Sequence, residues 1–113
     1  MAEDIKIRKA EGTWVARAGG AVIADSENAL ELTESGHDPV IYFPRNDVAM
    51  ALLEESVKTT TCPHKGVAKY FSIQTKSLLI SNAAWSYEKP KPGVEAIARY
   101  LAFYPDKVAI EQV

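Results

Sequence analysis

Turn-forming residues interrupt this chain at short intervals, and this spacing constrains its fold more than any other feature of the sequence. Gly19-Gly20 separates two short apolar stretches, and such a pair favours a β-hairpin because tight hairpin turns need positive φ. Prolines bound the apolar stretch in 38–44, and they cannot continue a β-ladder. The segment KPKPG at 89–93 breaks the chain again, and a Pro-Asp turn follows at 105–106. We therefore expect short strands joined by close turns, without regular strand–helix alternation.

Alternating apolar residues predict the strands between these turns. Ile5 and Ile7 alternate with charged residues near the start of the chain. Trp85 and Tyr87 follow residues 67–75 after a short polar turn, which predicts a second hairpin. The strand at 67–75 is expected to carry two sets of residues on its two faces, Val67, Phe71 and Ile73 on one and Ala68, Tyr70 and Ser72 on the other.

Two stretches have helical spacing instead. The first is RNDVAMALLEES at 45–56, where Pro44 and Asp47 suit a first helical turn, and the second is 94–101. A chain of 113 residues has the size of one domain, which we expect to span 1–113. The predicted fold class is mainly β, a curved antiparallel sheet or partly closed barrel with two short helices.

Charge and composition exclude several classes of partner. The chain is 47% hydrophobic and 25% charged, which predicts a compact core. Its net charge is −2 with no basic block, so we expect no nucleic-acid partner. No apolar run approaches the ~20 residues that cross a bilayer, and MAEDIKIRK lacks the apolar core of a signal peptide. The single cysteine cannot form an internal disulfide, which agrees with a reducing compartment. From these three observations together we expect a cytoplasmic protein with no membrane partner.

The segment TTTCPHKG at 59–66 holds the lone Cys62 beside His64 and Lys65, and three interpretations remain open. Lys65 or a protonated His64 would lower the pKa of the thiol and make Cys62 a nucleophile. Cys62 and His64 could instead hold a metal with one carboxylate, but the chain offers few ligands and His37 is distant in sequence, so no metal site is predicted. The third interpretation is a hydrogen-bonded loop in which Cys62 is a small packing residue.

Arg45 and Lys65 are the candidate anion-binding pair. Arg45 begins the first predicted helix, where free N–H groups favour an anion, and a guanidinium grips a carboxylate or phosphate with two bonds. The alternative is that Arg45 pairs with Asp47 or another surface acid. Trp85 and Tyr87 could stack on a planar ligand or pack in the core. The sequence contains neither G-x-x-x-x-G-K-[ST] nor G-x-G-x-x-G, the usual nucleotide-binding loops.

Four segments, PVIYFPRNDV, TTTCPHKGVAKYFSI, NAAWSYEKP and IARYLAFYPDKVAI, carry a resemblance to a known family. In this order and spacing they closely resemble the family catalogued as domain of unknown function 427, which is also labelled a nucleotidyltransferase domain. The resemblance implies an Mss4-like β-rich fold. His64 stands where relatives commonly have tyrosine. The family's characteristic residues correspond here to Tyr42, Pro44, Arg45, Asp47, Cys62, Pro63, Lys65, Gly66, Tyr70, Trp85, Tyr87 and Tyr104.

The leading hypothesis is a pocket for a small anionic or polar ligand. The sequence identifies no cofactor and leaves open whether the protein is an enzyme. Candidate catalytic residues are Cys62, Lys65 and Asp47. Candidate ligand-binding residues are Tyr42, Arg45, Tyr70, Trp85 and Tyr87. Two alternatives remain: a nucleotidyltransferase-like enzyme and a non-catalytic interaction domain that uses an exposed strand edge. The sequence leaves the oligomeric state open.

Overall fold

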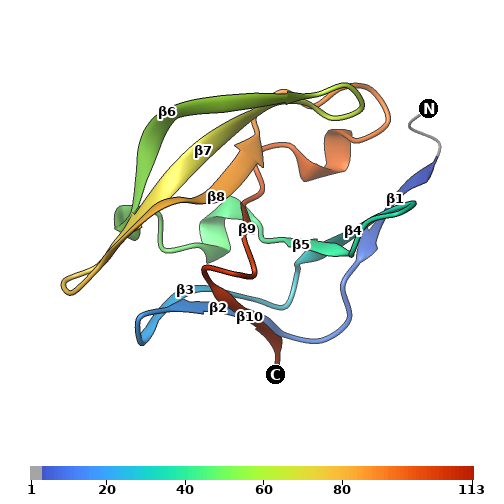
Figure 1. Cartoon of the computed structure of the whole chain (residues 1–113). Helices are drawn as coiled ribbons and strands as arrows, with labels where there is room; N and C mark the ends of the chain where they lie inside the picture. Colours follow the sequence, from blue (N-terminus) through green and yellow to red (C-terminus); the bar gives the residue numbers. More distant parts are fainter. Residues whose placement is uncertain (1–3) are drawn as a thin grey trace.

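The computed structural model describes residues 4–113, which form three antiparallel sheets joined by short turns (Figure 1). The sheets have the strand orders β1-β4-β5, β10-β2-β3 and β6-β7-β8-β9. The strands are β1 (Ile5–Lys9), β2 (Trp14–Ala18), β3 (Ala21–Ser26), β4 (Leu30–Glu34), β5 (Val40–Tyr42), β6 (Leu53–Cys62), β7 (Gly66–Gln74), β8 (Leu79–Tyr87), β9 (Ala102–Phe103) and β10 (Ala109–Gln112).

The hairpins predicted from the turn signals are confirmed. Gly19 and Gly20 join β2 to β3 with φ values of 55° and 81°, the left-handed region that the paired glycines permit. Strands β7 and β8 form the second hairpin, in which Tyr70 pairs with Trp85. The local turn chemistry therefore specified both connections.

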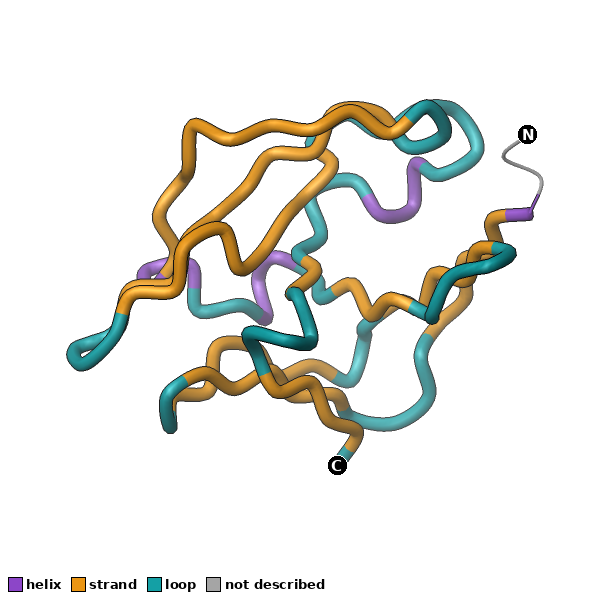
Figure 2. Tube along the Cα trace, viewed as in Figure 1, coloured by secondary structure: helices purple, strands orange, loops and turns teal. Residues whose placement is uncertain are grey.

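The sheets are stacked, with the β6–β9 sheet at one end and the β10-β2-β3 sheet at the other (Figures 1 and 2). Strands β4 and β5 lie between them. A backbone bridge between Phe43 and Leu101 ties the region after β5 to β9, and a second bridge joins Ala24 of β3 to Val48. The sheets do not close into a barrel, and the Mss4-like arrangement stays a prediction.

Two clusters of buried side chains fill the space between the layers. One is centred on Phe43, Phe71 and Phe103. The other lies between β4-β5 and β7-β8 and is rich in tyrosine, with Tyr42, Tyr70 and Tyr87 among its buried members. Because β7 sends Phe71 into the first cluster and Tyr70 into the second, both of its faces are covered there. Val67 is 56% exposed, so this face of β7 is uncovered at the start of the strand.

The predicted helix at 45–56 is wrong. Residues 45–52 form two single 3-10 turns, Arg45–Asp47 and Met50–Leu52, and Leu53 starts the ten-residue strand β6. A helix of this length has little stability alone, whereas β6 gains a ladder with β7, and the β-branched Thr59–Thr61 run favours an extended chain. Residues 59–66 are accordingly not a long loop, because Cys62 ends β6 and pairs with Gly66 at the start of β7.

The predicted helix at 94–101 is also wrong. Only Glu95–Ile97 forms a 3-10 turn, after which Arg99 takes a positive φ of 66° and Leu101 exchanges hydrogen bonds with Phe43. Val94, Ile97 and Leu101 are buried, but spacing of three residues also fits one 3-10 turn followed by a long-range bridge. No helix among residues 4–113 is long and apolar enough to span a membrane.

Candidate ligand-binding site

A pocket of about 240 Å³ opens between β4-β5 and the β7-β8 hairpin, on the tyrosine-rich side of the fold. We call it the tyrosine pocket. It is lined by Leu32, Glu34, His37, Asp38, Val40, Tyr42, Lys65, Tyr70, Trp85, Tyr87 and Tyr104. Five of the eight residues that the sequence nominated therefore meet here: Tyr42, Lys65, Tyr70, Trp85 and Tyr87.

The strand register places the aromatic wall. Trp85 and Tyr87 share one face of β8, and Tyr70 lies opposite Trp85 on β7. The Trp85 ring lies edge-on to Tyr42 at 6.4 Å and tilted against Tyr104 at 4.6 Å between ring centroids. Such pairs fix the rings of both partners, so the pocket has a rigid aromatic side.

The hydroxyl groups of the four tyrosines differ in how they are hydrogen-bonded. The Tyr70 hydroxyl bonds to Thr60 Oγ1 at 3.0 Å and to the Tyr104 hydroxyl at 3.1 Å. The Tyr42 hydroxyl accepts a bond from Trp85 Nε1 at 3.3 Å, and its own proton has no acceptor among residues 4–113. Tyr87 is 6% exposed, yet its hydroxyl has no hydrogen-bond partner in the described part of the chain. Tyr42 and Tyr87 therefore keep donors available for a ligand.

Burial favours the neutral form of three of these phenols, those of Tyr42, Tyr87 and Tyr104. Burial raises the pKa of Tyr42 to about 12, although the Trp85 N–H bond opposes the shift. Burial, reinforced by Tyr42, also raises the pKa of Tyr87, and burial with the Tyr70 hydrogen bond raises that of Tyr104. These three hydroxyls are consequently donors rather than bases near neutral pH.

The charges at the mouth of the pocket are largely compensated. Lys65 Nζ lies 2.9 Å from Glu34 Oε1, and both side chains are mostly buried. The hydrogen bond from Lys65 lowers the pKa of Glu34 despite the opposing effect of burial, and His37 and His64 add to the lowering. Asp38 adds a second carboxylate to the lining. The tyrosine pocket thus has no excess of positive charge.

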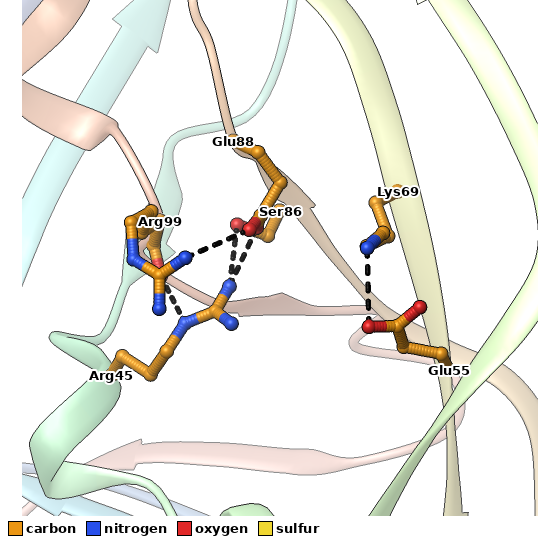
Figure 3. A network of polar contacts seen from close by, with 6 residues as sticks. All are labelled: Arg45, Glu55, Lys69, Ser86, Glu88 and Arg99. Carbon is orange, nitrogen blue, oxygen red and sulfur yellow. Dashed lines mark hydrogen bonds and ion pairs between the residues drawn. The ribbon is translucent and has the colours of Figure 1, made fainter.

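Arg45 does not line the tyrosine pocket and instead contacts Ser86, Glu88 and Arg99 (Figure 3). Its Nη2 atom donates to Glu88 at 2.6 Å and to Ser86 at 3.2 Å, and its Nε donates to the carbonyl of Arg99 at 2.9 Å. Since Ser86 alternates with Trp85 and Tyr87 along β8, its side chain points away from the tyrosine pocket. The structure therefore separates Arg45 from Lys65.

The Glu88 carboxylate is the centre of the Arg45 network, and its neighbours favour its charged form. Burial would raise the pKa of Glu88, but the Ser86 hydroxyl and the Arg45 charge lower it further than burial raises it. Arg99 reaches the second Glu88 oxygen at 3.2 Å, so one carboxylate bridges two guanidinium groups (Figure 3). The hydrogen bonds from Arg45 therefore connect the 3-10 turn Arg45–Asp47 to the backbone at Arg99 and to Glu88, which directly follows β8.

Asp47 and Cys62 do not line the tyrosine pocket either. Asp47 accepts a hydrogen bond from Ser26 Oγ at 2.6 Å and faces a shallow polar depression with Lys9 and Asp25. Cys62 is half-buried and packs against the tyrosine cluster. Among residues 4–113, no three His, Cys, Asp or Glu side chains gather as metal ligands. The catalytic roles assigned to Cys62, Lys65 and Asp47 stay predictions.

Sequence reasoning missed Glu34, His37 and Asp38 as lining residues. They belong to β4 and the polar turn ESGHDP at 34–39, directly before the β5 strand that carries Tyr42. The signal was present, because a polar turn feeding a strand of the site brings its side chains to the pocket mouth. Tyr104 was also missing from the candidate site, although the family resemblance includes it.

The fold and site define a small β-rich domain with an aromatic pocket between its layers. The chain belongs to the family described as Domain of unknown function (DUF427), labelled NTP_transf_9, whose model matches residues 6–113. This match confirms the resemblance drawn from the four sequence segments. No curated protein matches the chain.

Proposed function

We propose that this protein binds a small, uncharged polar molecule in the tyrosine pocket, with a flat ring against Trp85 and a hydrogen-bond acceptor facing Tyr42 and Tyr87. The observation that carries the proposal is Tyr87, a 6% exposed residue of the pocket lining whose hydroxyl has no hydrogen-bond partner among residues 4–113. The hydroxyl is therefore free to donate a hydrogen bond to a partner that enters the pocket. A carbonyl oxygen of a ligand would be such a partner.

The charges favour an uncharged ligand over the anionic one that the sequence also allowed. Lys65 is committed to Glu34 at 2.9 Å, and Arg45 is held by Glu88 outside the tyrosine pocket. Asp38 would repel an anion at the mouth. The remaining donors are neutral phenols, which suit a neutral acceptor such as an amide or ketone.

The size of the pocket fits a compact ligand. Its volume of about 240 Å³ lies just below the usual range of about 300–1,000 Å³ for small-molecule sites. Trp85 and Tyr104 are already fixed against each other, so a ring that stacks on them orders few side chains on binding. We assign binding and no reaction, since Cys62 and Asp47 lie outside the lining.

Two other functions have their own tests. The family label motivates nucleotidyl transfer, which predicts that ATP with magnesium raises the melting temperature. The edge strand β6, with Val57 fully exposed, motivates an interaction domain that pairs with a partner strand. If ATP with magnesium leaves the melting temperature unchanged, nucleotidyl transfer is ruled out. If a Val57→Lys variant captures a partner protein as well as the wild type does, pairing through β6 is ruled out.

The direct test compares benzamide, benzoate and benzylamine, which share a ring and differ in charge. We expect benzamide to shift the Trp85 indole N–H resonance saturably in ¹H–¹⁵N NMR titrations, and to bind more tightly than benzoate. The affinity of so small a probe should be weak, because binding free energy scales with ligand size. Tighter binding of benzoate, or no saturable shift at Trp85 with benzamide, would contradict the proposal.

A further inference from the structure

A second cavity, of about 390 Å³, lies beyond Trp85 from the tyrosine pocket. We call it the apolar lobe. Six of its lining residues are apolar and do not line the tyrosine pocket: Trp14, Pro39, Ile41, Phe103, Pro105 and Ile110. Four of them lie on β2, β5, β9 and β10, and the two prolines lie directly before β5 and shortly after β9. Figure 1 shows where these strands lie in the fold. The walls of the apolar lobe suit hydrocarbon.

The two cavities adjoin each other, because they share part of their lining. Asp38, Val40 and Trp85 line both of them. A ligand seated against the indole of Trp85 in the tyrosine pocket therefore has the apolar lobe within reach over the same side chain. Val40 offers an apolar contact along the way.

The charges around the junction restrict the ligand further. Glu31 and Asp38 are the charged residues of the second cavity, and both are acids, so an anionic tail would be repelled. Asp38 at the junction can accept a hydrogen bond from an N–H group that links the two parts of a ligand. The tyrosine pocket supplies donors for an acceptor on the flat end.

We propose that the natural ligand is a neutral amphiphile, whose flat polar head occupies the tyrosine pocket and whose apolar tail crosses Trp85 into the apolar lobe. This proposal rests on the proposed function, which concerns the head alone. It names the ligand class as a secondary amide or similar linked molecule with a tail of several carbons. The occupant of the apolar lobe is thus part of the same small molecule rather than a peptide or a second copy of the chain.

The test uses N-methylbenzamide, N-butylbenzamide and N-hexylbenzamide with the full chain, measured by calorimetry and NMR. Each added methylene should tighten binding roughly two- to fourfold, as expected for a CH₂ that is partly or fully removed from water at ~0.8 kcal/mol. Nuclear Overhauser contacts should join the tail methyl to Ile110 and the ring to Tyr87. Affinity that is independent of chain length overturns this inference and leaves the proposed function standing, whereas no binding by any of the three overturns both.

Substitutions can distinguish binding in the apolar lobe from binding in the tyrosine pocket. Ile110→Gln should abolish the chain-length dependence while the affinity for N-methylbenzamide changes less than twofold, because Ile110 does not line the tyrosine pocket. The matched control Leu79→Gln alters an exposed apolar residue of β8 outside both cavities and should keep the dependence. Ile110 packs partly against the core, so its substitution could also lower stability. Pro105 is exposed, and Pro105→Gln is therefore a second variant that should likewise abolish the chain-length dependence. A dimer that Ile110→Gln converts to a monomer would make the lobe a contact between two copies and overturn the inference.

Discussion

Removal of the Tyr87 hydroxyl should weaken ligand binding without weakening the fold. Tyr87→Phe deletes a hydroxyl that has no hydrogen-bond partner among residues 4–113, so no internal bond is lost. The free energy of unfolding should change by less than ~1 kcal/mol, since the substitution removes no hydrogen bond within the protein. The same change removes one donor to the ligand, worth ~1 kcal/mol for a neutral hydrogen bond, so the dissociation constant for benzamide should rise about three- to tenfold.

Tyr70→Phe is the matched control, because it makes the same chemical change at a hydroxyl with two partners. That hydroxyl contacts Thr60 at 3.0 Å and Tyr104 at 3.1 Å. Its loss should cost about 1–2 kcal/mol of folding free energy, which lowers the melting temperature by roughly 4–10 °C for a domain of this size. Benzamide binding should change less than in Tyr87→Phe, since the Tyr70 hydroxyl is already occupied.

Urea denaturation followed by tryptophan fluorescence gives the stabilities, and NMR titration gives the affinities. The contrast between the two variants is the informative quantity, because both keep the ring that packs in the core. If Tyr87→Phe lost more than about 1.5 kcal/mol of stability and bound benzamide as the wild type does, the hydroxyl would have an internal structural role. The reasoning behind the pocket would then fail.

Three further predictions concern residues around the site. Glu88→Gln should lower the free energy of unfolding by ~1–2 kcal/mol at pH 7, where the carboxylate holds Arg45. Because the pKa of Glu88 is lowered in the folded protein, this difference from the wild type should shrink as the pH falls below about 4.5 and vanish below the folded pKa, as measured by urea melts at several pH values. Gly66→Ala should cost about 1–3 kcal/mol in thermal melts, since Gly66 has a φ of 115° that L-residues rarely adopt, and equal stability would refute this. Cys62→Ser should change the benzamide dissociation constant less than twofold by NMR, and a larger effect would place Cys62 in the site after all.

Local turn chemistry explains why the hairpins could be predicted. Gly19 and Gly20 both take positive φ in the β2–β3 turn, so that connection is decided by two adjacent residues. The alternation of Trp85 and Tyr87 likewise places both on one face of β8 wherever the strand lies in the fold. The shared face of Trp85 and Tyr87 in the site followed from this short-range rule.

Long-range pairs decided what could not be predicted. The stretch that ends at Leu101 has helical spacing, but the hydrogen bonds that Leu101 exchanges with Phe43 hold the chain extended there. Arg45 stands beside the Tyr42 strand in sequence, yet its partners Ser86 and Glu88 come from more than 40 residues away. Those partners set where the guanidinium lies. No local sequence pattern indicates that choice, so the separation of Arg45 from Lys65 could not be predicted from the sequence.

The most direct measurement is a crystal structure of the protein grown with benzamide. The account predicts the ring against Trp85 and the carbonyl oxygen within hydrogen-bond distance of the Tyr87 or Tyr42 hydroxyl. Benzamide bound only outside the tyrosine pocket, or a Tyr87 hydroxyl bonded to another group of the protein with the pocket filled by side chains, would contradict it.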